Sequence, residues 1–376
     1  MASIPVLLPS PDVRDRLADR GLGTAVRCYQ CATCSGVCEL APSAAPFPRQ
    51  QMLWAQWGMI DRLAADPAVW LCHQCNDCTV RCPRDAQPGD VLQALRSVII
   101  ERLSFPRAFG RLVAGARASW PILLGVPIAF WIVLLGVTGH LAVPAGLEAG
   151  WGYDALVPHA FIYGVFFPVA ASTLVAMWVG GRRHWKLMGA HTPREGSFLA
   201  NLVPSVGEIA VHNRFSSCDT AAPRRLGHLL LLWGFVGAAI TSALLIVAMY
   251  VQGLHMPLEL THPYKILGNL SAALLVVGGA ILVGNRIGDP KVAGRSHAFD
   301  LFFLGVVVLV IVTGMVVEFA RLADAPAVAL WTYIVHLGSV MCLFITLPYS
   351  KFAHMVYRTL AMVHQRMVEP ASAQST

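Results

Sequence analysis

The chain has 376 residues, of which 56% are hydrophobic and only 13% are Asp, Glu, Lys or Arg. An average soluble domain is roughly 25% charged, so the composition excludes a purely cytosolic globular enzyme, and the apolar content excludes a disordered chain. The net charge of +7 lies in residues 101–376, which carry 19 basic and 12 acidic side chains, because residues 1–100 carry 9 of each. The positive charge therefore belongs to the apolar part and does not indicate a nucleic-acid-binding surface.

Residues 1–105 hold eight of the ten cysteines and no apolar run long enough to cross a bilayer. The first residues lack the basic and the long apolar segments of a secretory signal. In the reducing cytoplasm, dense cysteine indicates metal binding rather than disulfides. We therefore expect a small helical cytoplasmic domain over residues 1–105, followed by a linker over 106–118.

Two cysteine motifs in this domain share the spacing C-x2-C-x2-C-x3-C, which is typical of ferredoxins with two [4Fe–4S] clusters. In such motifs the fourth cysteine ligates the cluster of the other motif. The expected ligands are Cys28, Cys31, Cys34 and Cys82 for one cluster, and Cys72, Cys75, Cys78 and Cys38 for the other. Zinc is the alternative, but tetrahedral zinc sites usually combine C-x2-C pairs without a third spaced cysteine. Residues 49–65 are predicted to form one amphipathic helix between the motifs.

For three further residues near or outside these motifs we expect no metal-binding role. Cys218 and Cys342 stand alone in the sequence and are expected to be small core residues. His73 lies inside the second motif, where we expect a polar neighbour of the cluster rather than a ligand.

Six apolar runs follow, each about 20 residues long, which is the length that a helix needs to cross a hydrocarbon core. They cover approximately residues 120–143, 157–180, 226–250, 264–284, 299–319 and 330–349. We expect a membrane domain over 119–365 and a tail over 366–376. The predicted fold class is therefore mainly α, with a small α-helical two-[4Fe–4S] ferredoxin-like domain followed by a six-helix transmembrane bundle.

Lys and Arg are distributed unequally between the two sets of loops. The loops on the side of the cysteine domain carry 17 of them, whereas the opposite loops carry only Arg321, with Lys265 at the edge of the fourth run. Because cytoplasmic loops of membrane proteins are enriched in these residues, we expect both termini and the cysteine domain to be cytoplasmic, in a multi-pass protein of the bacterial inner membrane.

Twelve of the thirteen histidines lie beyond residue 118, and ionisable side chains in membrane helices are candidate functional residues. His228 begins the third run and His354 follows the sixth at the same depth, so we predict that they are the axial ligands of a b-type haem, although two unrelated interfacial histidines are the alternative. His336 lies 18 residues before His354, about 27 Å of helix, and would serve a second haem at the opposite face. Its partner is open among His140, His159, His255 and His262, with His262 preferred.

The remaining histidines of the apolar part are expected to be solvated loop or tail residues. They are His184, His191, His212, His297 and His364.

These features resemble two known families. Residues 1–105, with both cysteine motifs and the segment Asp66-Pro-Ala-Val-Trp-Leu-Cys72, resemble the iron–sulfur C subunit of heterodisulfide reductase. Residues 155–365 resemble the nitrate reductase gamma-subunit family of membrane dihaem cytochromes b, through His336 and a His354 that follows Leu347-Pro348-Tyr349-Ser350-Lys351. The fusion of the two is similar to the C subunit of the quinone-interacting membrane-bound oxidoreductase complex.

The resemblance also implies a quinone site, and the chain differs from the family at one position. The family has a lysine at the outer start of the fourth helix, where Lys265 stands here, and interfacial snorkelling is the alternative role. Glu318 is a weaker candidate proton acceptor. The family's second histidine, ten residues after His228, is replaced by Ala238, so the family pattern leaves His336 without a partner ligand.

The function implied by the resemblance is electron transfer in a membrane. A quinone or quinol would bind near His336, Lys265 and His262. Electrons would pass between it and the cytoplasmic partner through b-type haems and then two [4Fe–4S] clusters. The partner would be a pair of flavin and iron–sulfur subunits that serve adenylylsulfate reductase. One alternative is the membrane subunit of a heterodisulfide reductase-like complex, although the chain has no Cys-Cys dipeptide. Another is a membrane-anchored iron–sulfur or zinc sensor without electron transfer.

Overall fold

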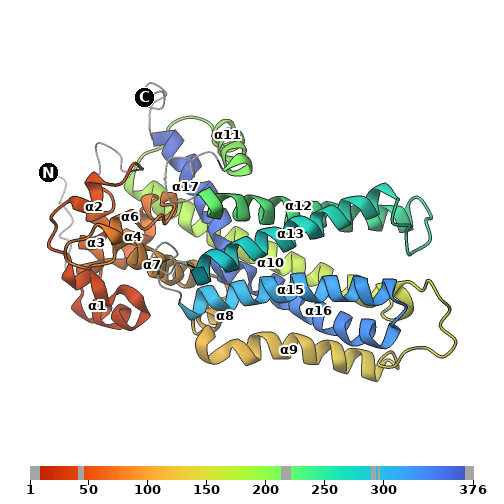
Figure 1. The fold of residues 1–376 in the computed structure, drawn as a ribbon. Coiled ribbons are helices and arrows are strands. Elements are labelled where there is room, and N and C mark those ends of the chain that lie inside the picture. Colours follow the sequence, from red (N-terminus) through yellow and green to blue (C-terminus); the bar gives the residue numbers. More distant parts are fainter. Residues whose placement is uncertain (1–8, 41–45, 213–221, 289–293, 295–296, 369–376) are drawn as a thin grey trace.

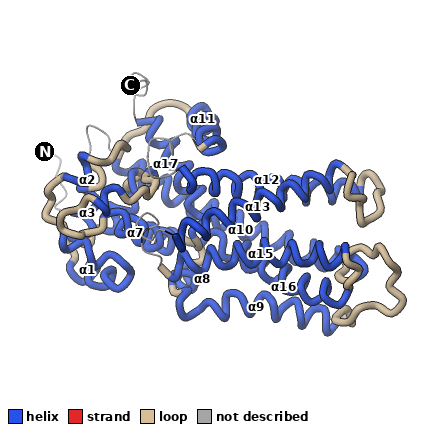
Figure 2. The backbone as a smooth tube through the Cα atoms, viewed as in Figure 1, coloured by secondary structure: helices blue, strands red, loops and turns tan. Residues whose placement is uncertain are grey.

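The computed structural model describes residues 9–40, 46–212, 222–288, 294 and 297–368, and within these residues all regular structure is helical (Figure 2). Short helices gather at one end of the molecule, and long helices extend from them side by side (Figure 1). The prediction of a mainly α fold, with a small helical domain before six long apolar helices, is confirmed. We call the part from α1 to α7 the head, and the two ends of the long helices the head side and the far side.

The head consists of short helices around a common core. Its α-helices are α1 (Pro11–Leu17), α2 (Thr33–Gly36), α3 (Arg49–Gln56), α4 (Ile60–Ala65), α5 (Ala68–Leu71), α6 (Asp77–Val80) and α7 (Pro88–Leu103). Helix α7 supplies much of the core, because Leu95 and Ile99 are fully buried against Leu63 and Trp70. The two short helices α2 and α6 each begin inside one cysteine motif.

The predicted helix over residues 49–65 is wrong as a single element, because the chain breaks between α3 and α4. Gly58, in the break, has φ +67°, a left-handed conformation that glycine adopts without steric cost. A Cβ at this position would lie 2.3 Å from the carbonyl oxygen of Ser10. The close approach of α1 therefore requires a glycine here and ends the helix that the apolar pattern predicts.

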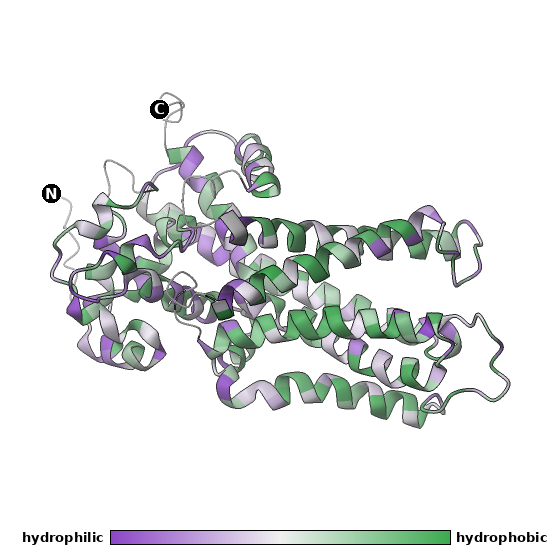
Figure 3. Cartoon of the chain, in the orientation of Figure 1, coloured by the Kyte–Doolittle hydropathy of each residue, from purple (hydrophilic) through white to green (hydrophobic). Residues whose placement is uncertain are grey.

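Six helices of the described residues are long and apolar enough to cross a membrane, as predicted. They are α9 (Ala116–Val137), α10 (His159–His191), α12 (Ala222–Tyr250), α13 (Pro263–Gly288), α15 (Ala298–Leu322) and α16 (Pro326–Thr346). Most of their residues are hydrophobic (Figure 3). Helix α16 is central and packs against α9, α10 and α15, whereas α12 packs mainly on α13, which also contacts α15 (Figure 1).

Glycines allow α12 and α13 to approach closely. A Cβ on Gly278 of α13 would lie 2.8 Å from the carbonyl oxygen of Gly227 of α12, and a Cβ on Gly234 would lie 2.8 Å from the Leu275 side chain. Membrane helices use small residues in this way because backbone contact replaces the hydrophobic driving force that is absent in lipid. The pair fixes the position of His228, which follows Gly227.

Three shorter helices lie on the head side of the bundle. They are α8 (Arg107–Ala114), α11 (Phe198–Val211) and α17 (His354–Val368). Helix α8 lies within residues 106–118, which were predicted to be a linker. The buried Cys342 is a core residue of α16, as expected, whereas Cys218 and the side chain of His191 lie outside the described part of the chain.

The head and the long helices share one hydrophobic core. The Trp70 ring of the head stacks on Tyr357 of α17 at 4.8 Å between ring centroids. His184 of α10 is fully buried beside both rings, and its Nδ1 lies 3.2 Å from the carbonyl oxygen of Ala64. The expectation of a solvated His184 is therefore wrong, because the head covers this end of α10.

Polar bonds reinforce the same junction. Arg183 of α10 donates to the carbonyl oxygens of Leu103 and Ser104 at 3.0 and 2.6 Å. Lys351 forms an ion pair with Asp300 at 2.8 Å, and Gln93 of α7 donates to the other oxygen of that carboxylate. The head is thus held to α10, α15 and the start of α17.

Two other histidines that were expected to be solvated are also covered. His297, before α15, is half-buried, and a Cβ on Gly21 of the head would lie 2.6 Å from its ring. His364 of α17 is buried, with 2% of its surface exposed, and its ring lies edge-on to Trp185. Both expectations of a solvated histidine are wrong, because other parts of the chain cover these residues. The sequence alone does not show which residues the head and α17 cover.

Candidate functional site

The two cysteine motifs fold in the same way. Gln30 and Ala32 of the first motif have φ of +58° and +69°, and Gln74 and Asn76, at the equivalent positions of the second, have φ of +56° and +70°. Such conformations are uncommon for residues with a Cβ and curve the backbone around the sulfurs, as loops that bind clusters do. The backbone N–H of Gln74 donates to Cys72 Sγ at 3.3 Å. Hydrogen bonds of this kind tune cluster potentials.

The cysteines expected to bind the first cluster come together. Cys28, Cys31, Cys34 and Cys82 line one small pocket at the surface of the head. Cys82 belongs to the second motif, 44 residues beyond Cys38 in the sequence. Its place among the cysteines of the first motif agrees with the predicted exchange of fourth ligands, in which the fourth cysteine of each motif binds the cluster of the other. Burial, together with the charges of Cys28 and Cys31, raises the pKa of the Cys34 thiol.

The expected ligands of the second cluster are also neighbours. Burial is the main cause that raises the pKa of Cys78, and the charges of Cys72, Cys75 and Cys38 raise it further. Thiolates that repel each other in this way are stabilised by iron, which binds the deprotonated form. Within the described residues, no three His, Cys, Asp or Glu side chains are close enough together to bind a single metal ion.

His228 and His354, the histidine pair predicted from the sequence, lie close together in the structure. The rings of His228 on α12 and His354 at the start of α17 lie 6.0 Å apart between centroids, with an angle of 78° between their planes. His354 Nδ1 lies 2.6 Å from the carbonyl oxygen of Lys351. An Nδ1–H that donates to this oxygen leaves Nε2 with the lone pair for a metal. Burial lowers the pKa of His354 to about 3, which keeps the imidazole neutral, as iron ligation requires.

A third histidine, which sequence reasoning missed, supports this pair. His212 Nε2 lies 2.8 Å from His228 Nδ1, and only 6% of the His212 surface is exposed, so the expectation of a solvated residue is wrong. His212 ends α11 with φ +53°. The apolar run 198–211 is the signal that could have identified it, because a short apolar helix packs on a neighbouring surface and carries the next residue with it. With both Nδ1 atoms hydrogen-bonded, each imidazole would keep its Nε2 available for a metal.

Arginines one turn from the histidine pair connect it to the second cysteine motif. Arg224 precedes His228 by four residues on α12, and Arg358 follows His354 by four residues on α17, so each arginine lies on the same helix face as its histidine. Arg224 donates to the carbonyl oxygen of His73 at 3.0 Å, and Arg358 Nη2 lies 2.9 Å from His73 Nδ1. His73 is thus held between the two helices that carry the predicted haem ligands.

A third arginine completes this arrangement. Arg96 of α7 donates to the carbonyl oxygen of Cys72 at 2.6 Å, and Arg358 donates to the same oxygen at 3.5 Å. Arg224 also donates to the carbonyl oxygen of Gln74 at 2.6 Å. We call Arg96, Arg224 and Arg358 the arginine cluster. Three positive charges beside the second motif favour the more negative, reduced form of a bound cluster.

On the far side, His336 and its preferred partner make separate contacts. His336 Nδ1 lies 3.0 Å from Thr313 Oγ1 of α15, and Gly314 leaves room for the ring, because a Cβ there would lie 3.0 Å from His336 Cε1. The His262 ring packs on Tyr264, whose backbone N–H donates to His262 Nδ1 at 3.3 Å. The described contacts do not join His336 to His262, and a haem between them stays a prediction.

Lys265 lies in a charged network at the far ends of α13 and α15. Its Nζ is 2.7 Å from Glu318 Oε1, and Arg321 pairs with the same carboxylate at 3.0 Å. Tyr153, from the segment between α9 and α10, donates its hydroxyl to Glu318 at 2.7 Å. Sequence reasoning named Lys265 and Glu318 but missed Tyr153, which comes from a distant part of the chain.

Comparison with known proteins divides the chain at the same place as its composition does. A family model described as 4Fe-4S dicluster domain matches residues 24–86, and one described as Citrate utilization protein B matches residues 122–375. The Citrate utilization protein B of Escherichia coli is 28% identical over 359 residues, which cover 89% of this chain and 88% of that protein. No solved structure matches the chain.

Other relatives match the head. The C subunit of the H2:CoB-CoM heterodisulfide,ferredoxin reductase of Methanothermobacter thermautotrophicus is 40% identical over 73 residues, which cover 19% of this chain and 38% of that protein. The second iron-sulfur C subunit of the CoB–CoM heterodisulfide reductase of Methanocaldococcus jannaschii is 28% identical over 118 residues, covering 31% of this chain and 60% of that protein. The predicted resemblance of the head to this kind of subunit is confirmed, and the head is a [4Fe–4S] domain. The matches give no support to the resemblance of the membrane part to the nitrate reductase gamma subunit.

Proposed function

The chain belongs to the citrate utilization protein B family, and we propose that it is the membrane subunit of an oxidoreductase complex that transfers electrons between a quinone and a soluble partner. The proposed redox groups are two [4Fe–4S] clusters in the head and a b-type haem. The observation that carries the proposal is the arginine cluster, because it joins the backbone of the second cysteine motif to the two helices that bear His228 and His354. A sensor that only binds iron would not need this junction.

The residues of the histidine pair would hold and orient the haem. His228 and His354 would each present Nε2 to the iron, while His212 and the carbonyl oxygen of Lys351 hold their Nδ1 atoms. Second-shell bonds of this kind fix the ring orientation and increase ligand basicity. A bound b-type haem would supply a one-electron centre on the head side, next to the second cluster's motif.

The far-side network fits the proton chemistry of a quinone. Quinol oxidation releases two electrons and two protons, and quinone reduction takes up the same number, so the site needs a donor and an acceptor. Lys265 Nζ would donate a hydrogen bond to a quinone oxygen, and Glu318 would exchange a proton with it. Arg321 and Tyr153 hold the carboxylate in place. We place His336 and His262 in this site as candidate residues, His336 as a ligand of a second haem.

The proposed partners are soluble flavin and iron–sulfur subunits on the head side, which we place in the cytoplasm of a bacterium. The 17 Lys and Arg of the head-side loops support this orientation. The heterodisulfide reductase relatives of the head are themselves subunits of larger enzymes, which supports a complex. The family name favours a partner in the use of citrate, and the adenylylsulfate reductase link has no support in the matched proteins.

A second candidate function is the membrane subunit of a heterodisulfide reductase-like complex, and the similarity of the head favours it. The two functions share the redox groups and differ in the soluble partner. Purification from native membranes in mild detergent, with the co-purifying subunits identified by mass, distinguishes them. Cys-Cys-Gly modules are associated with disulfide reduction. A co-purifying flavin subunit without them supports the first function, and a subunit with them supports the second.

Optical spectra of the same preparation test the haem. We expect a reducible b-type band and about eight non-haem irons per chain from two four-iron clusters, in addition to the haem iron. His228→Ala and His354→Ala should each remove the same low-spin signal, whereas the control His140→Ala, at the far side beside Thr138, should retain it. The absence of a b-type band, or the loss of different signals in the two variants, would refute the histidine pair.

A further inference from the structure

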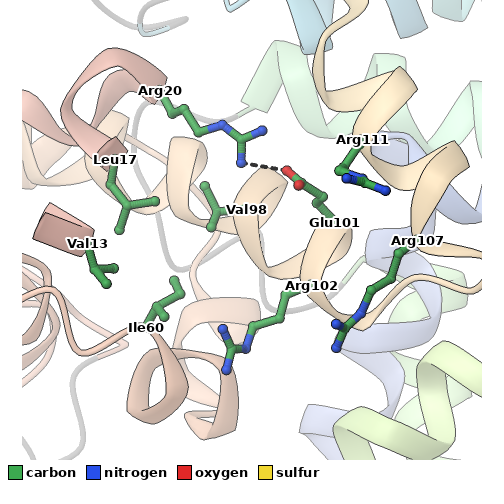
Figure 4. A pocket seen from close by; sticks show the side chains of 9 residues that line it. All are labelled: Val13, Leu17, Arg20, Ile60, Val98, Glu101, Arg102, Arg107 and Arg111. Atoms are coloured by element: carbon green, nitrogen blue, oxygen red, sulfur yellow. Dashed lines mark ion pairs between the residues drawn. The ribbon is translucent and has the colours of Figure 1, made fainter. Parts of the chain in front are cut away.

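A cavity lies between the head and α8, the helix that precedes the first long helix, and the electron-transfer proposal does not use it. It has a volume of about 570 Å³ and is lined by α1, α4, α7, α8 and the turn Ala18–Leu22 that follows α1 (Figure 4). Four arginines surround it, namely Arg20, Arg102, Arg107 and Arg111, while its other walls are the aliphatic side chains of Val13, Leu17, Ile60 and Val98. The cavity therefore combines strong positive charge with an apolar lining.

Two of the four arginines have carboxylate partners and two have none among the described residues. Arg20 forms an ion pair with Glu101, which also lines the cavity, at 2.5 Å (Figure 4). Arg102 pairs with Asp61. Arg107 and Arg111 lie one turn apart on the exposed face of α8, and no carboxylate in the described part of the chain pairs with them. The cavity thus has two positive charges available for an anion.

Helix α8 places these two charges at the level of a membrane surface. Phe109 of α8 stacks at 5.7 Å on Tyr349, which lies three residues beyond the end of α16, and α9 begins two residues after α8 ends. Exposed aromatic side chains flank the site, since Phe105 and Phe109 are each 43% exposed and Trp120 is 54% exposed. Aromatic residues in such positions are typical of the boundary between lipid and water.

We propose that this cavity binds the headgroup phosphate of an anionic phospholipid, with Arg107 and Arg111 as the phosphate ligands. Basic pockets beside membrane helices on the positively charged side bind such headgroups, and two guanidinium groups one turn apart suit the several oxygens of one phosphodiester. The aliphatic walls favour a lipid over a free inorganic anion, because they offer nothing to a small hydrated ion. The site depends only on a membrane location and not on the electron-transfer proposal.

The test measures lipid binding to the full chain after purification and delipidation in detergent. Native mass spectrometry would follow titrations with short-chain phosphatidylglycerol, short-chain phosphatidylcholine, glycerol phosphate and inorganic phosphate. We expect phosphatidylglycerol to bind most tightly. The double variant Arg107→Gln/Arg111→Gln should weaken it roughly 30-fold, since each basic residue near a membrane surface contributes about a fivefold effect. Arg117→Gln, an exposed arginine on α9 outside the cavity, is the matched control and should change it less than threefold.

Three results would overturn the proposal. Equal binding of phosphatidylcholine would show a general lipid contact, and equal binding of inorganic phosphate would show a site for a soluble anion. Unchanged lipid binding in the double variant, together with loss of a co-purifying subunit, would show a protein interface. The double variant Arg107→Lys/Arg111→Lys is the control for misfolding, because it changes the same two residues but keeps their charge. It should bind phosphatidylglycerol within fivefold of the unmodified chain.

Discussion

Removal of the Arg358 charge should lower the reduction potential of the second cluster. Arg358 Nη1 lies 3.5 Å from the carbonyl oxygen of Cys72, and covalent geometry keeps that oxygen within about 5 Å of Cys72 Sγ. The positive charge is therefore no more than about 8 Å from a ligand sulfur. At an effective dielectric constant of about 20, a unit charge at this distance contributes about 2 kcal/mol, which corresponds to about 90 mV for a one-electron couple.

The variant Arg358→Gln should thus shift the second cluster by roughly 40 to 90 mV to lower potential, the smaller value allowing for solvent screening of a half-buried group. Redox titration followed by electron paramagnetic resonance measures both clusters, and the first cluster is an internal reference because Cys28, Cys31, Cys34 and Cys82 lie in a separate pocket. Arg358→Lys keeps the charge and should shift the potential by less than half as much. Equal shifts in both variants, or a shift of the first cluster, would refute an electrostatic role.

Three further predictions test the ligands and the packing. Cys38→Ser should alter the resonance signal of the second cluster and leave that of the first, and the opposite pattern would reverse the exchange of fourth ligands. His212→Ala should keep the proposed haem but shift its potential or lower its affinity 10- to 100-fold, because the bond to His228 would orient a proposed ligand; an unchanged spectrum and potential would contradict this role. Gly278→Leu should destabilise the protein by about 1–3 kcal/mol in thermal melting, whereas Gly284→Leu, whose Cβ would meet nothing within 4 Å, should not.

The sequence predicted the membrane helices well because the bilayer imposes their length and composition. The fourth run, predicted over 264–284, is the helix Pro263–Gly288, and the third, predicted over 226–250, is Ala222–Tyr250. Both helices extend beyond the runs on the head side, and in the extension of α12 the polar Arg224 contacts the head instead of lipid. Hydropathy cannot detect these extensions, since their partners lie far away in the sequence.

Burial on the head side had a local signal only at His212, which follows the apolar run 198–211. His184 follows Arg182 and Arg183, and His364 precedes Gln365 and Arg366, so neither neighbourhood indicates a buried residue. All three histidines are nevertheless buried. Each is covered by an element from a distant part of the chain, as the bond of His184 to Ala64 illustrates. Spacing was sufficient to place His228 beside His354, because two helix ends at equal depth on one side of a membrane must be near each other in a small bundle.

The arginine cluster changes the meaning of the charge asymmetry between the loops. Arg224 and Arg358 were counted among the 17 head-side Lys and Arg, and both bond to the second cysteine motif. Arg183, from the same set, donates to the carbonyl oxygen of Leu103 in the head, and Lys351 pairs with Asp300 of α15, whose carboxylate also accepts a hydrogen bond from Gln93 of the head. Part of the asymmetry is therefore required by the contact with the head, in addition to any effect on membrane orientation. Because these bonds tie the head to the positively charged loops, the cysteine motifs and the His228–His354 pair share one side of the membrane whichever compartment that side faces.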